Sequence, residues 1–248
     1  MNIYDALLSG FFPSPFQIQF SNLAQENPKS VLPNIFWRKE MKELMDGYVG
    51  VKFRAIQLSS DMPLVIKAIF PLFKQSAQLL KEYGMTPKNG GNISLKRVDG
   101  MVITSSGSNL GSLEEDEIVH VRKCSIEDRI VEYDGLNVPS SETFMHYLIY
   151  QLRSNIGAIV HAHDPATSRF ATASVKETAK EEPYGTLDLA KIACDTFSKN
   201  EDVIILKNHG YVAVGQNLEE ATNLIVSTHL KIVQENDIST LAGLRDHP

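Results

Sequence analysis

The sequence has few cysteines and no long hydrophobic run. Cys124 and Cys194 are the only cysteines among 248 residues, too few for a disulfide framework, which favours a reducing compartment. No apolar run approaches the ~20 residues that a helix needs to span a bilayer. The first residues, MNIYDALLSGFF, carry Asp5 and lack the basic start of a signal peptide. We therefore expect a cytoplasmic protein that does not bind or cross a membrane.

An excess of positive charge is also missing. The 24 Lys and Arg residues are outnumbered by 30 Asp and Glu, which gives a formal net charge of -6. This balance argues against a nucleic-acid surface and against binding to anionic membranes. The length suits one large domain, or one domain with an appended segment, and the 43% of hydrophobic residues is enough for a sizeable core. These features are typical of a globular enzyme or of a relative of one.

Residues 1–61 differ from the rest of the chain. Four prolines punctuate the first half of this segment, and the stretch SNLAQENPKS is polar. Further on, FWRKEMKELMDGY predicts a short helix, and VGVKFRAIQL alternates enough to predict a strand. We interpret residues 1–61 as an N-terminal extension packed on a main domain of residues 62–248.

Helical and strand patterns are mixed along this main domain. PLFKQSAQLLKEYGM predicts a helix with Leu72, Phe73, Ala77 and Leu80 on one face and Gly84 at its end. VPSSETFMHYLIYQL and LEEATNLIVSTHLKIVQEN predict two more helices, whereas MVIT, GAIVHAH and VIIL predict strands. Short strand pairs joined by turns favour an α/β sheet that includes antiparallel pairs and carries helices on its faces.

The stretch IGAIVHAHDPAT places two histidines, His161 and His163, at the end of an apolar strand. Alternate residues of a strand share a face, so both imidazoles are expected to point the same way, as two ligands of one zinc ion would. Taken alone, such a pair is more often two unrelated histidines. His209 in KNHG, after another apolar strand, supplies a third ligand and leaves a fourth position open, as in catalytic zinc sites. By itself, the NHG tripeptide is typical of an ordinary turn.

Three loops have the chemistry of an anion site. PSSE places Ser140 and Ser141 at the start of a helix, where free backbone N–H groups attract anions, although either serine could simply be the N-cap. GGNIS offers Asn92, and TSSGS offers Ser106 and Gly107. Each loop alone is a common turn sequence. Together they are what a phosphate-bearing substrate would need.

Glu142 lies in the first turn of the same helix. A carboxylate at this position is favoured by the helix dipole, so capping is one explanation. The functional explanation is a carboxylate beside a metal that takes a proton from a carbon next to a carbonyl. His146, one turn further on, is expected to have a supporting role in the core.

Five motifs occur in a fixed order: GGNISLK, ITSSGS, PSSETFMH, AIVHAHDPAT and ILKNHGYVAVG. Over roughly residues 72–236 the chain thereby resembles the class II aldolase/adducin family. The resemblance implies a three-layer α/β fold, with a central nine-stranded, mostly antiparallel sheet flanked by helices, assembled as a homotetramer. It implies Zn²⁺, or another divalent metal, bound by His161, His163 and His209. It also implies Glu142 as the acid/base residue and a phosphate pocket made by Asn92, Ser106, Gly107, Ser140 and Ser141.

The activity that the resemblance implies is that of a zinc-dependent aldehyde-lyase. Such an enzyme cleaves a small phosphorylated ketose to dihydroxyacetone phosphate and an aldehyde through an enediolate. Two alternatives stay open: a sugar-phosphate dehydratase or epimerase on the same fold, and a non-catalytic adducin-like module. The family's epimerases carry aspartate where this chain has Glu142, and its adducin-like members lack the metal histidines, so both features favour an aldolase.

One interval departs from the pattern of the family's sugar-phosphate aldolases. In those enzymes a long segment before the third histidine carries a tyrosine that reaches a neighbouring subunit's site and protonates the aldehyde oxygen. Here the interval SRFATASVKETAKEEPYGTLDL looks shortened, and Tyr184 is its only tyrosine. We expect KETAKEE to be a solvated loop, and the proton donor for the aldehyde stays open.

Overall fold

The structure is a computed structural model that describes residues 52–164, 174–197 and 201–243, with the side chains of residues 237–243 left out. The helix predicted from FWRKEMKELMDGY lies outside these residues. The strand predicted from VGVKFRAIQL is present as β1, Arg54–Ser59. No helix in the described part of the chain is long and apolar enough to cross a membrane. Both cysteines are free, as expected.

The described strands form one sheet, in the order β1-β5-β4-β3-β2-β6-β8-β7. All neighbours pair antiparallel except β1 and β5, which pair parallel. The mostly antiparallel sheet that the resemblance implied is thereby confirmed, and the described residues hold eight of its strands. The remaining strand bounds are β2 Asn92–Arg97, β3 Gly100–Thr104, β4 Ile118–Ser125, β5 Ile130–Asp134, β6 Ala158–Ala162, β7 Val203–Leu206 and β8 Gly210–Gly215.

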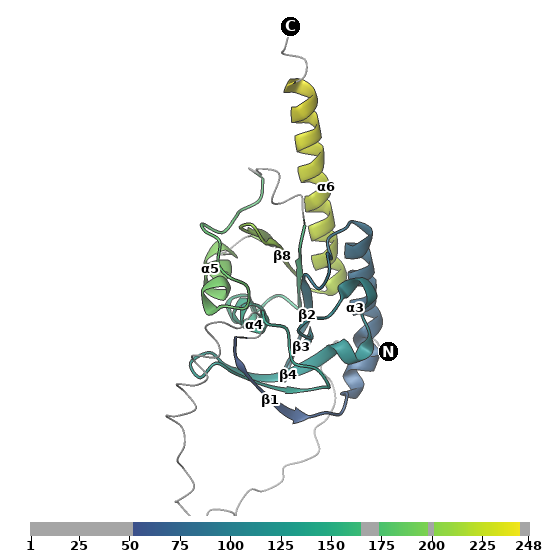
Figure 1. Ribbon diagram of the computed structural model, residues 1–248, viewed down its shortest axis with the longest axis vertical. Coiled ribbons are helices and arrows are strands. Elements are labelled where there is room, and N and C mark those ends of the chain that lie inside the picture. Colours follow the sequence, from purple (N-terminus) through teal and green to yellow (C-terminus); the bar gives the residue numbers. More distant parts are fainter. Residues whose placement is uncertain (1–51, 165–173, 198–200, 244–248) are drawn as a thin grey trace, which may run out of the picture. The chain divides into compact units, whose positions relative to one another are not determined.

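Helices cover the sheet on both faces (Figure 1). Helices α3, Leu64–Glu82, and α6, Leu218–Gly243, lie on one face, and α4, Thr143–Leu152, and α5, Leu187–Phe197, lie on the other. Each face has its own hydrophobic core. Phe73 of α3 packs in a cluster with Val160 of the sheet, whereas Phe144 of α4 packs in a second cluster with Ile103. The predicted three-layer α/β fold is therefore confirmed.

Helix α3 begins earlier than its sequence pattern predicts. It starts at Leu64, so that Pro71 lies inside the helix and not at its beginning. Proline lacks the N–H of the helical ladder and usually marks a first turn, which is why the pattern pointed to Pro71 as the start. Phe73 and Leu80 are buried as expected, but Leu72 is 38% exposed and does not belong to the buried face.

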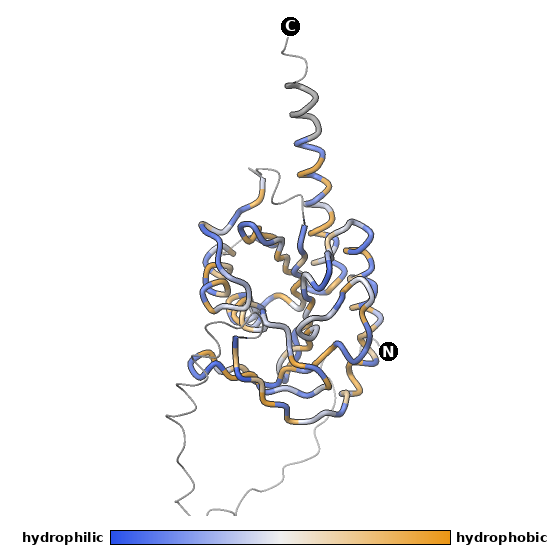
Figure 2. The backbone as a smooth tube through the Cα atoms, in the orientation of Figure 1, coloured by the Kyte–Doolittle hydropathy of each residue, from blue (hydrophilic) through white to orange (hydrophobic). Residues whose placement is uncertain are grey.

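The ends of two helices follow their local sequence. At the end of α3, Gly84 has a φ of 70°, and the Gly84 and Met85 N–H groups donate to the carbonyls of Lys81 and Leu80. These two bonds are the Schellman pattern, which needs a left-handed residue such as glycine. At the start of α6, the Glu220 N–H donates to the Asn217 side chain at 2.8 Å, so Asn217 caps this helix. Along α6, hydrophobic and hydrophilic stretches alternate (Figure 2).

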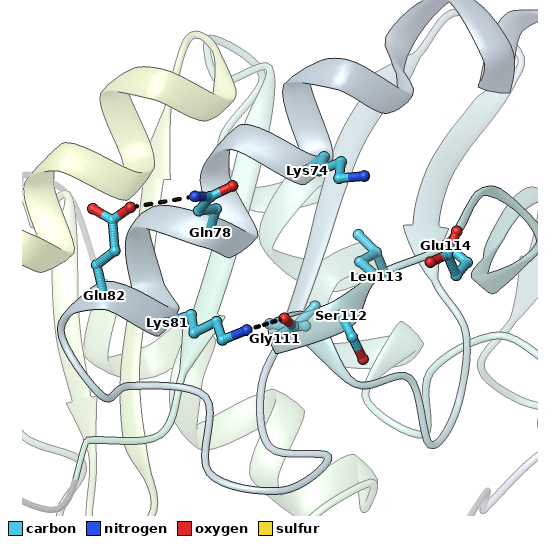
Figure 3. Close-up of a pocket in the computed structure, with 9 residues that line it drawn as sticks. Lys74, Gln78, Lys81, Glu82, Gly111, Ser112, Leu113 and Glu114 are labelled. Atoms are coloured by element: carbon cyan, nitrogen blue, oxygen red, sulfur yellow. Dashed lines mark hydrogen bonds between the residues drawn. The ribbon is translucent and has the colours of Figure 1, made fainter.

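The exposed side of α3 borders a surface cavity of about 440 Å³. The short 3-10 helix η1, Leu110–Ser112, forms the opposite wall, and Lys81 ties the two walls together by donating to the Gly111 carbonyl at 2.7 Å (Figure 3). Lysines and glutamates both line this cavity, and none of the predicted site residues does. This cavity is therefore separate from the predicted site residues.

Candidate functional site

Two adjoining segments bring the three predicted histidines together. His161 lies in β6, and His163 follows one residue after the end of that strand. His209 lies in the turn between β7 and β8, and β8 pairs with β6. One nitrogen from each imidazole lies within 4.8 Å of the other two. The three ring centroids are 4.7 to 4.9 Å apart.

Hydrogen bonding defines the tautomer of His161. Its Nδ1 lies 2.7 Å from the carbonyl oxygen of Tyr211, which can only accept, so Nδ1 carries the proton. The lone pair of His161 Nε2 then faces the centre of the cluster, 3.0 Å from Nε2 of His163. A backbone carbonyl that holds one ring nitrogen while the other points inward is a common support for a metal-binding histidine.

Burial keeps these rings neutral. Desolvation, with a smaller contribution from neighbouring histidines, lowers the pKa of His161 to about 3 and that of His163 to about 3. Metal ligation requires the unprotonated imidazole. At neutral pH both rings therefore present the form that can bind a cation.

Glu142 lies against the same cluster and is itself buried. Its carboxylate oxygens are 3.3 Å from His161 Nε2 and 3.7 Å from His209 Nε2. Asn92, which opposes His161 in the β2–β6 pairing, donates to Glu142 Oε2 at 2.7 Å. A buried carboxylate and three potential metal ligands thus converge at one point, from the start of α4, the end of β6 and the β7–β8 turn.

The start of α4 differs from the predicted cap. The N-cap position belongs to Glu142 and not to Ser140 or Ser141, and Glu142 makes no side-chain cap. Ser140, two residues before Glu142, accepts two hydrogen bonds. Its hydroxyl accepts from the Glu142 N–H at 3.3 Å, and its carbonyl accepts from the Thr143 N–H. The carboxylate of Glu142 is therefore directed away from its own helix end and towards the histidines.

His146 is fully buried behind Glu142, in the supporting position expected for it. Its Nδ1 lies 2.7 Å from the Ser94 hydroxyl, which also lies 2.9 Å from the Tyr150 hydroxyl. Nε2 of His146 and Oε1 of Glu142 are buried, and neither has a hydrogen-bond partner among the described residues. The interior of the site thus keeps free polar atoms for a ligand.

The predicted phosphate residues fall into two groups. Ser105 and Pro139 form a bridge that places the Ser106–Gly107 turn alongside Ser140 and Ser141. Ser106 and Gly107 are exposed, Ser141 is half-buried and Ser140 is buried. Gly107 has a φ of 80°, and a Cβ at this position would meet nothing within 4 Å, so this turn is open. The second group is Asn92, whose side-chain amide donates to the Glu142 carboxylate.

The residues present fit a divalent metal. Three imidazoles, each with one nitrogen within 4.8 Å of a nitrogen of the other two, are a ligand set that zinc prefers, and they leave room for a fourth ligand. The His161 Nε2 lone pair and the Glu142 carboxylate oxygens point to the same small volume, where a cation would satisfy both. The buried and unpaired Oε1 of Glu142 agrees with this.

The sequence patterns did not reveal several contacts around the ligands. Asp164, directly after His163, accepts a 2.7 Å hydrogen bond from His229 of α6. Burial, and then the charge of Asp164, raises the pKa of Tyr211, whose carbonyl holds His161. Asp164 could have been identified from the sequence because it directly follows His163. His229 could not, because nothing in the sequence pattern of α6 distinguishes it from the other polar residues of that helix.

The segment KETAKEE is also different from expectation. Glu177 forms a parallel bridge with Ile205 of β7, and Thr178 is buried. The expectation of a solvated loop is therefore wrong for Thr178, although Lys180 and Glu181 are exposed. The charged composition of the stretch concealed its one buried residue.

Comparison with known proteins agrees with this arrangement. Residues 74–230 match the sequence profile of the family described as the class II aldolase and adducin N-terminal domain. The chain belongs to this family. The match spans β2 to β8 and contains all three histidines and Glu142.

Relatives of this class II aldolase family member include an L-fuculose phosphate aldolase of Methanocaldococcus jannaschii, 36% identical over 54% of this chain and 76% of the relative. A 5-methylthioribulose-1-phosphate/5-deoxyribulose-1-phosphate aldolase of Rhodospirillum rubrum is 27% identical over 61% of this chain and 72% of that protein. The names of these two relatives agree on aldolase and differ in the sugar.

Solved structures support the same fold. An L-fuculose 1-phosphate aldolase is 28% identical, covers 75% of this chain and 90% of its own, and superposes with a TM-score of 0.57. The L-fuculose-1-phosphate aldolase of Thermus thermophilus has a TM-score of 0.59 over 73% of this chain and 98% of its own, and at 20% identity it supports the fold alone.

Proposed function

We propose that the chain is a metal-dependent aldolase that cleaves a small phosphorylated ketose into dihydroxyacetone phosphate and an aldehyde. The observation that carries this proposal is the buried Glu142 carboxylate beside the cluster of His161, His163 and His209. Family membership supports aldolase chemistry, and the sugar phosphates in the relatives' names support the substrate class.

His161, His163 and His209 would hold Zn²⁺ or another divalent ion. When bound, such an ion acts as a Lewis acid that polarises a carbonyl oxygen, which is worth several kcal/mol to a developing negative charge. The chain itself provides the orientation. The Tyr211 carbonyl fixes the ring of His161 through Nδ1, so that Nε2 faces inward.

Glu142 would move the proton. When the carbon–carbon bond of the ketose breaks, the hydroxyl of the departing half loses its proton to solvent and becomes the aldehyde carbonyl, and the electron pair of the broken bond stays on the dihydroxyacetone phosphate half as an enediolate. Protonated Glu142 then gives a proton to that carbon and ends as a carboxylate, and in the direction of synthesis the carboxylate takes the same proton away. Asn92 keeps the Glu142 carboxylate in place through its 2.7 Å hydrogen bond.

The two adjoining loops would bind the substrate's phosphate. Ser106 and Gly107 lie in an open turn beside Ser140 and Ser141 at the start of α4. Hydroxyls and backbone N–H groups at a helix start are suited to a phosphate dianion. In this arrangement Asn92 serves Glu142 and the reacting carbons more directly than the phosphate.

The proposal extends to the organisation of the protein. We assign residues 62–248, together with β1, Arg54–Ser59, which pairs with β5, to the catalytic domain. The enzyme would act as a homotetramer, as the family resemblance implies, with a sugar phosphate as its only partner besides its own copies and with no role for nucleic acid or membrane. The cytoplasmic location expected from the two cysteines stays a prediction.

The experiment that tests this function is product analysis with zinc-loaded protein. L-Fuculose 1-phosphate, 5-deoxyribulose 1-phosphate and 5-methylthioribulose 1-phosphate form the panel, and released dihydroxyacetone phosphate is measured with a coupled reductase. We expect release from at least one of them. Loss of water without cleavage would identify a dehydratase, and inversion of one carbon an epimerase. No turnover of any sugar phosphate would favour a binding module.

Glu142→Gln tests the assigned proton transfer separately. The amide has the same shape but cannot act as a base, so deuterium exchange from solvent into dihydroxyacetone phosphate should fall by ~10²-fold or more. Metal content should stay unchanged, because the three histidines remain. Exchange at the wild-type rate would remove Glu142 from this role.

A further inference from the structure

The turn that carries His209 has an unusual backbone. The His209 N–H donates to the Leu206 carbonyl at 3.0 Å, which closes a four-residue turn, and Asn208 has a φ of 57°. A positive φ at the third position of such a turn is tolerated by glycine and asparagine and costs other residues energy. The position of the His209 ring thus depends on a backbone conformation that needs support.

One side of this turn is held by close backbone packing. A Cβ at Gly210 would lie 2.2 Å from the Ala162 carbonyl oxygen and 3.1 Å from the Cα of His163. The chain after His209 therefore passes directly against the end of β6, next to the other two histidines. The outer side of the turn contacts a different segment.

Residues 176–181, here called the clasp segment, hold the outer side. The segment runs parallel to β7, with the Thr178 N–H donating to the Ile205 carbonyl and the Ile205 N–H donating to the Lys176 carbonyl, both at 2.9 Å. It thus reaches the turn as an added edge of the sheet, in register with the strand that leads to His209.

Two side chains of the clasp segment bind the two residues that precede His209. The hydroxyl of Thr178 accepts a 2.9 Å hydrogen bond from the Lys207 N–H and donates to the Lys180 carbonyl at 3.1 Å. The Glu181 carboxylate accepts a 2.7 Å hydrogen bond from the Asn208 side-chain amide. Thr178 is only 2% exposed, so its bond to Lys207 is shielded from water.

We infer that Thr178 and Glu181 are positioning residues that fix the left-handed turn and thereby hold His209 against His161, His163 and Glu142. Neither residue touches the three histidines or the reacting atoms. The inference rests on the proposed metal site. It also gives a role to the interval between His163 and His209, part of which the sequence predicts as a solvated loop. Displacement of the turn would move Nε2 of His209 away from the other two ligands.

A set of variants separates the side-chain clasp from the backbone conformation. Asn208→Gly keeps the positive φ and removes only the amide, and Glu181→Ala removes its partner. Asn208→Asp places two carboxylates against each other, and the double variant, Asn208→Asp with Glu181→Gln, restores the hydrogen bond in the reverse direction. Thr178→Val removes the acceptor for Lys207, and Glu177→Ala is the matched control, an exposed glutamate of the same segment.

The first readout is hydrogen–deuterium exchange in the metal-free proteins. Amides of residues 206–210 should exchange severalfold faster in Asn208→Gly, Glu181→Ala and Thr178→Val than in the wild type or Glu177→Ala. The double variant should return to the wild-type rate. Unchanged exchange in the first three variants would overturn the inference, whatever the metal does.

The second readout is metal affinity, measured by competition with a chromophoric chelator for Zn²⁺ and by the visible spectrum of the Co²⁺ form. We expect affinity to fall ~10-fold in Asn208→Gly and Glu181→Ala, and further in Asn208→Asp, because lost support of a ligand typically has an effect of this order. In the double variant, affinity should recover to about the wild-type value. Suppose that the wild type binds no metal, but amide exchange of residues 206–210 changes among the variants as described. The proposed function would then be rejected, whereas the clasp segment would still be shown to support the turn with His209. Metal bound equally by all variants would overturn the role assigned to the clasp.

Discussion

At the scale of single residues, the candidate site depends on Gly90, which has no side chain, as much as on the histidines. A Cβ at Gly90 would lie 2.6 Å from Nδ1 of His163, closer than real Cβ contacts allow. Gly90→Ala should therefore displace the His163 ring and weaken metal binding by ~10-fold or more, the order found when support of a ligand is lost. Metal titration of the variant measures this effect.

The control for that change is Gly111→Ala. A Cβ there would meet the exposed Asn109 side chain at 3.1 Å, a group that can move away, and Gly111 lies outside the site. Its metal affinity should equal that of the wild type. If Gly90→Ala also bound metal normally, the ring of His163 would have another position available, and the geometry described for it would be wrong.

A second prediction at this scale concerns His146. Burial lowers its pKa to about 3, and the nearby charge of Glu142 only partly opposes this. The folded protein keeps the ring neutral, whereas the unfolded chain takes up a proton below the ordinary value of 6.5. Its contribution to stability is thus present above pH 6.5 and is lost as the pH falls towards 3, by about 2 kcal/mol at pH 5.

Urea unfolding of chelator-treated protein at pH 7 and pH 5 checks this. His146→Asn keeps a polar group near the Ser94 hydroxyl but does not titrate. From pH 7 to pH 5, the free energy of unfolding should fall in both proteins. The fall in His146→Asn should be about 2 kcal/mol smaller than the fall in the wild type. The buried histidines of the cluster remain in both proteins and cancel in the comparison. Parallel losses would mean that His146 is accessible to protons in the folded state.

Individual residues were predictable where a motif fixed both their type and their spacing. His161, His163, His209 and Glu142 were chosen from the sequence, and the structure brings all four together. The contact between Asp164 and His229 was not predictable, because it joins a strand end to a helix 65 positions further on and depends on how α6 lies.

At the scale of elements, the start of α4 carries a prediction about phosphate. Ser141 lies just before the helix, beside the open Ser106–Gly107 turn. Ser141→Ala should weaken the binding of dihydroxyacetone phosphate ~10-fold or more, because hydrogen bonds to charged groups are worth about 1.5–3 kcal/mol. Binding of unphosphorylated dihydroxyacetone should hardly change. Equal losses for both ligands would place the phosphate elsewhere.

The elements themselves were predictable from periodicity, and their boundaries less so. The pattern around Phe73 and Leu80 identifies α3 but not its first turns, from Leu64 to Pro71, because a proline usually marks the first turn of a helix. The clasp segment was missed for a different reason. Its lysines and glutamates indicate a solvated loop, and the parallel bridge of Glu177 to β7 is a tertiary contact that local sequence does not encode.

At the scale of the whole molecule, sheet topology decides where the chemistry lies. β6 and β8 are neighbours in the sheet, and β2 lies on the other side of β6, so that Asn92, His161 and the turn with His209 meet. The periodicity of the helical and strand segments predicted a mixed sheet that includes antiparallel pairs and carries helices on its faces. The strand order, and the parallel pairing of β1 with β5, follow from contacts between distant segments and came from the structure.

The central claim is that three histidines of this chain hold a catalytic divalent metal, and metal content tests it most directly. Elemental analysis should be made on wild-type protein purified without chelators and on two variants, His161→Ala and His209→Ala. His209 is the less buried of these two histidines. Circular dichroism checks that each variant is folded. The account predicts about one divalent ion per wild-type chain and its loss in both folded variants. A wild type without metal after incubation with Zn²⁺, Co²⁺ and Mn²⁺, or variants that retain the ion, would contradict it.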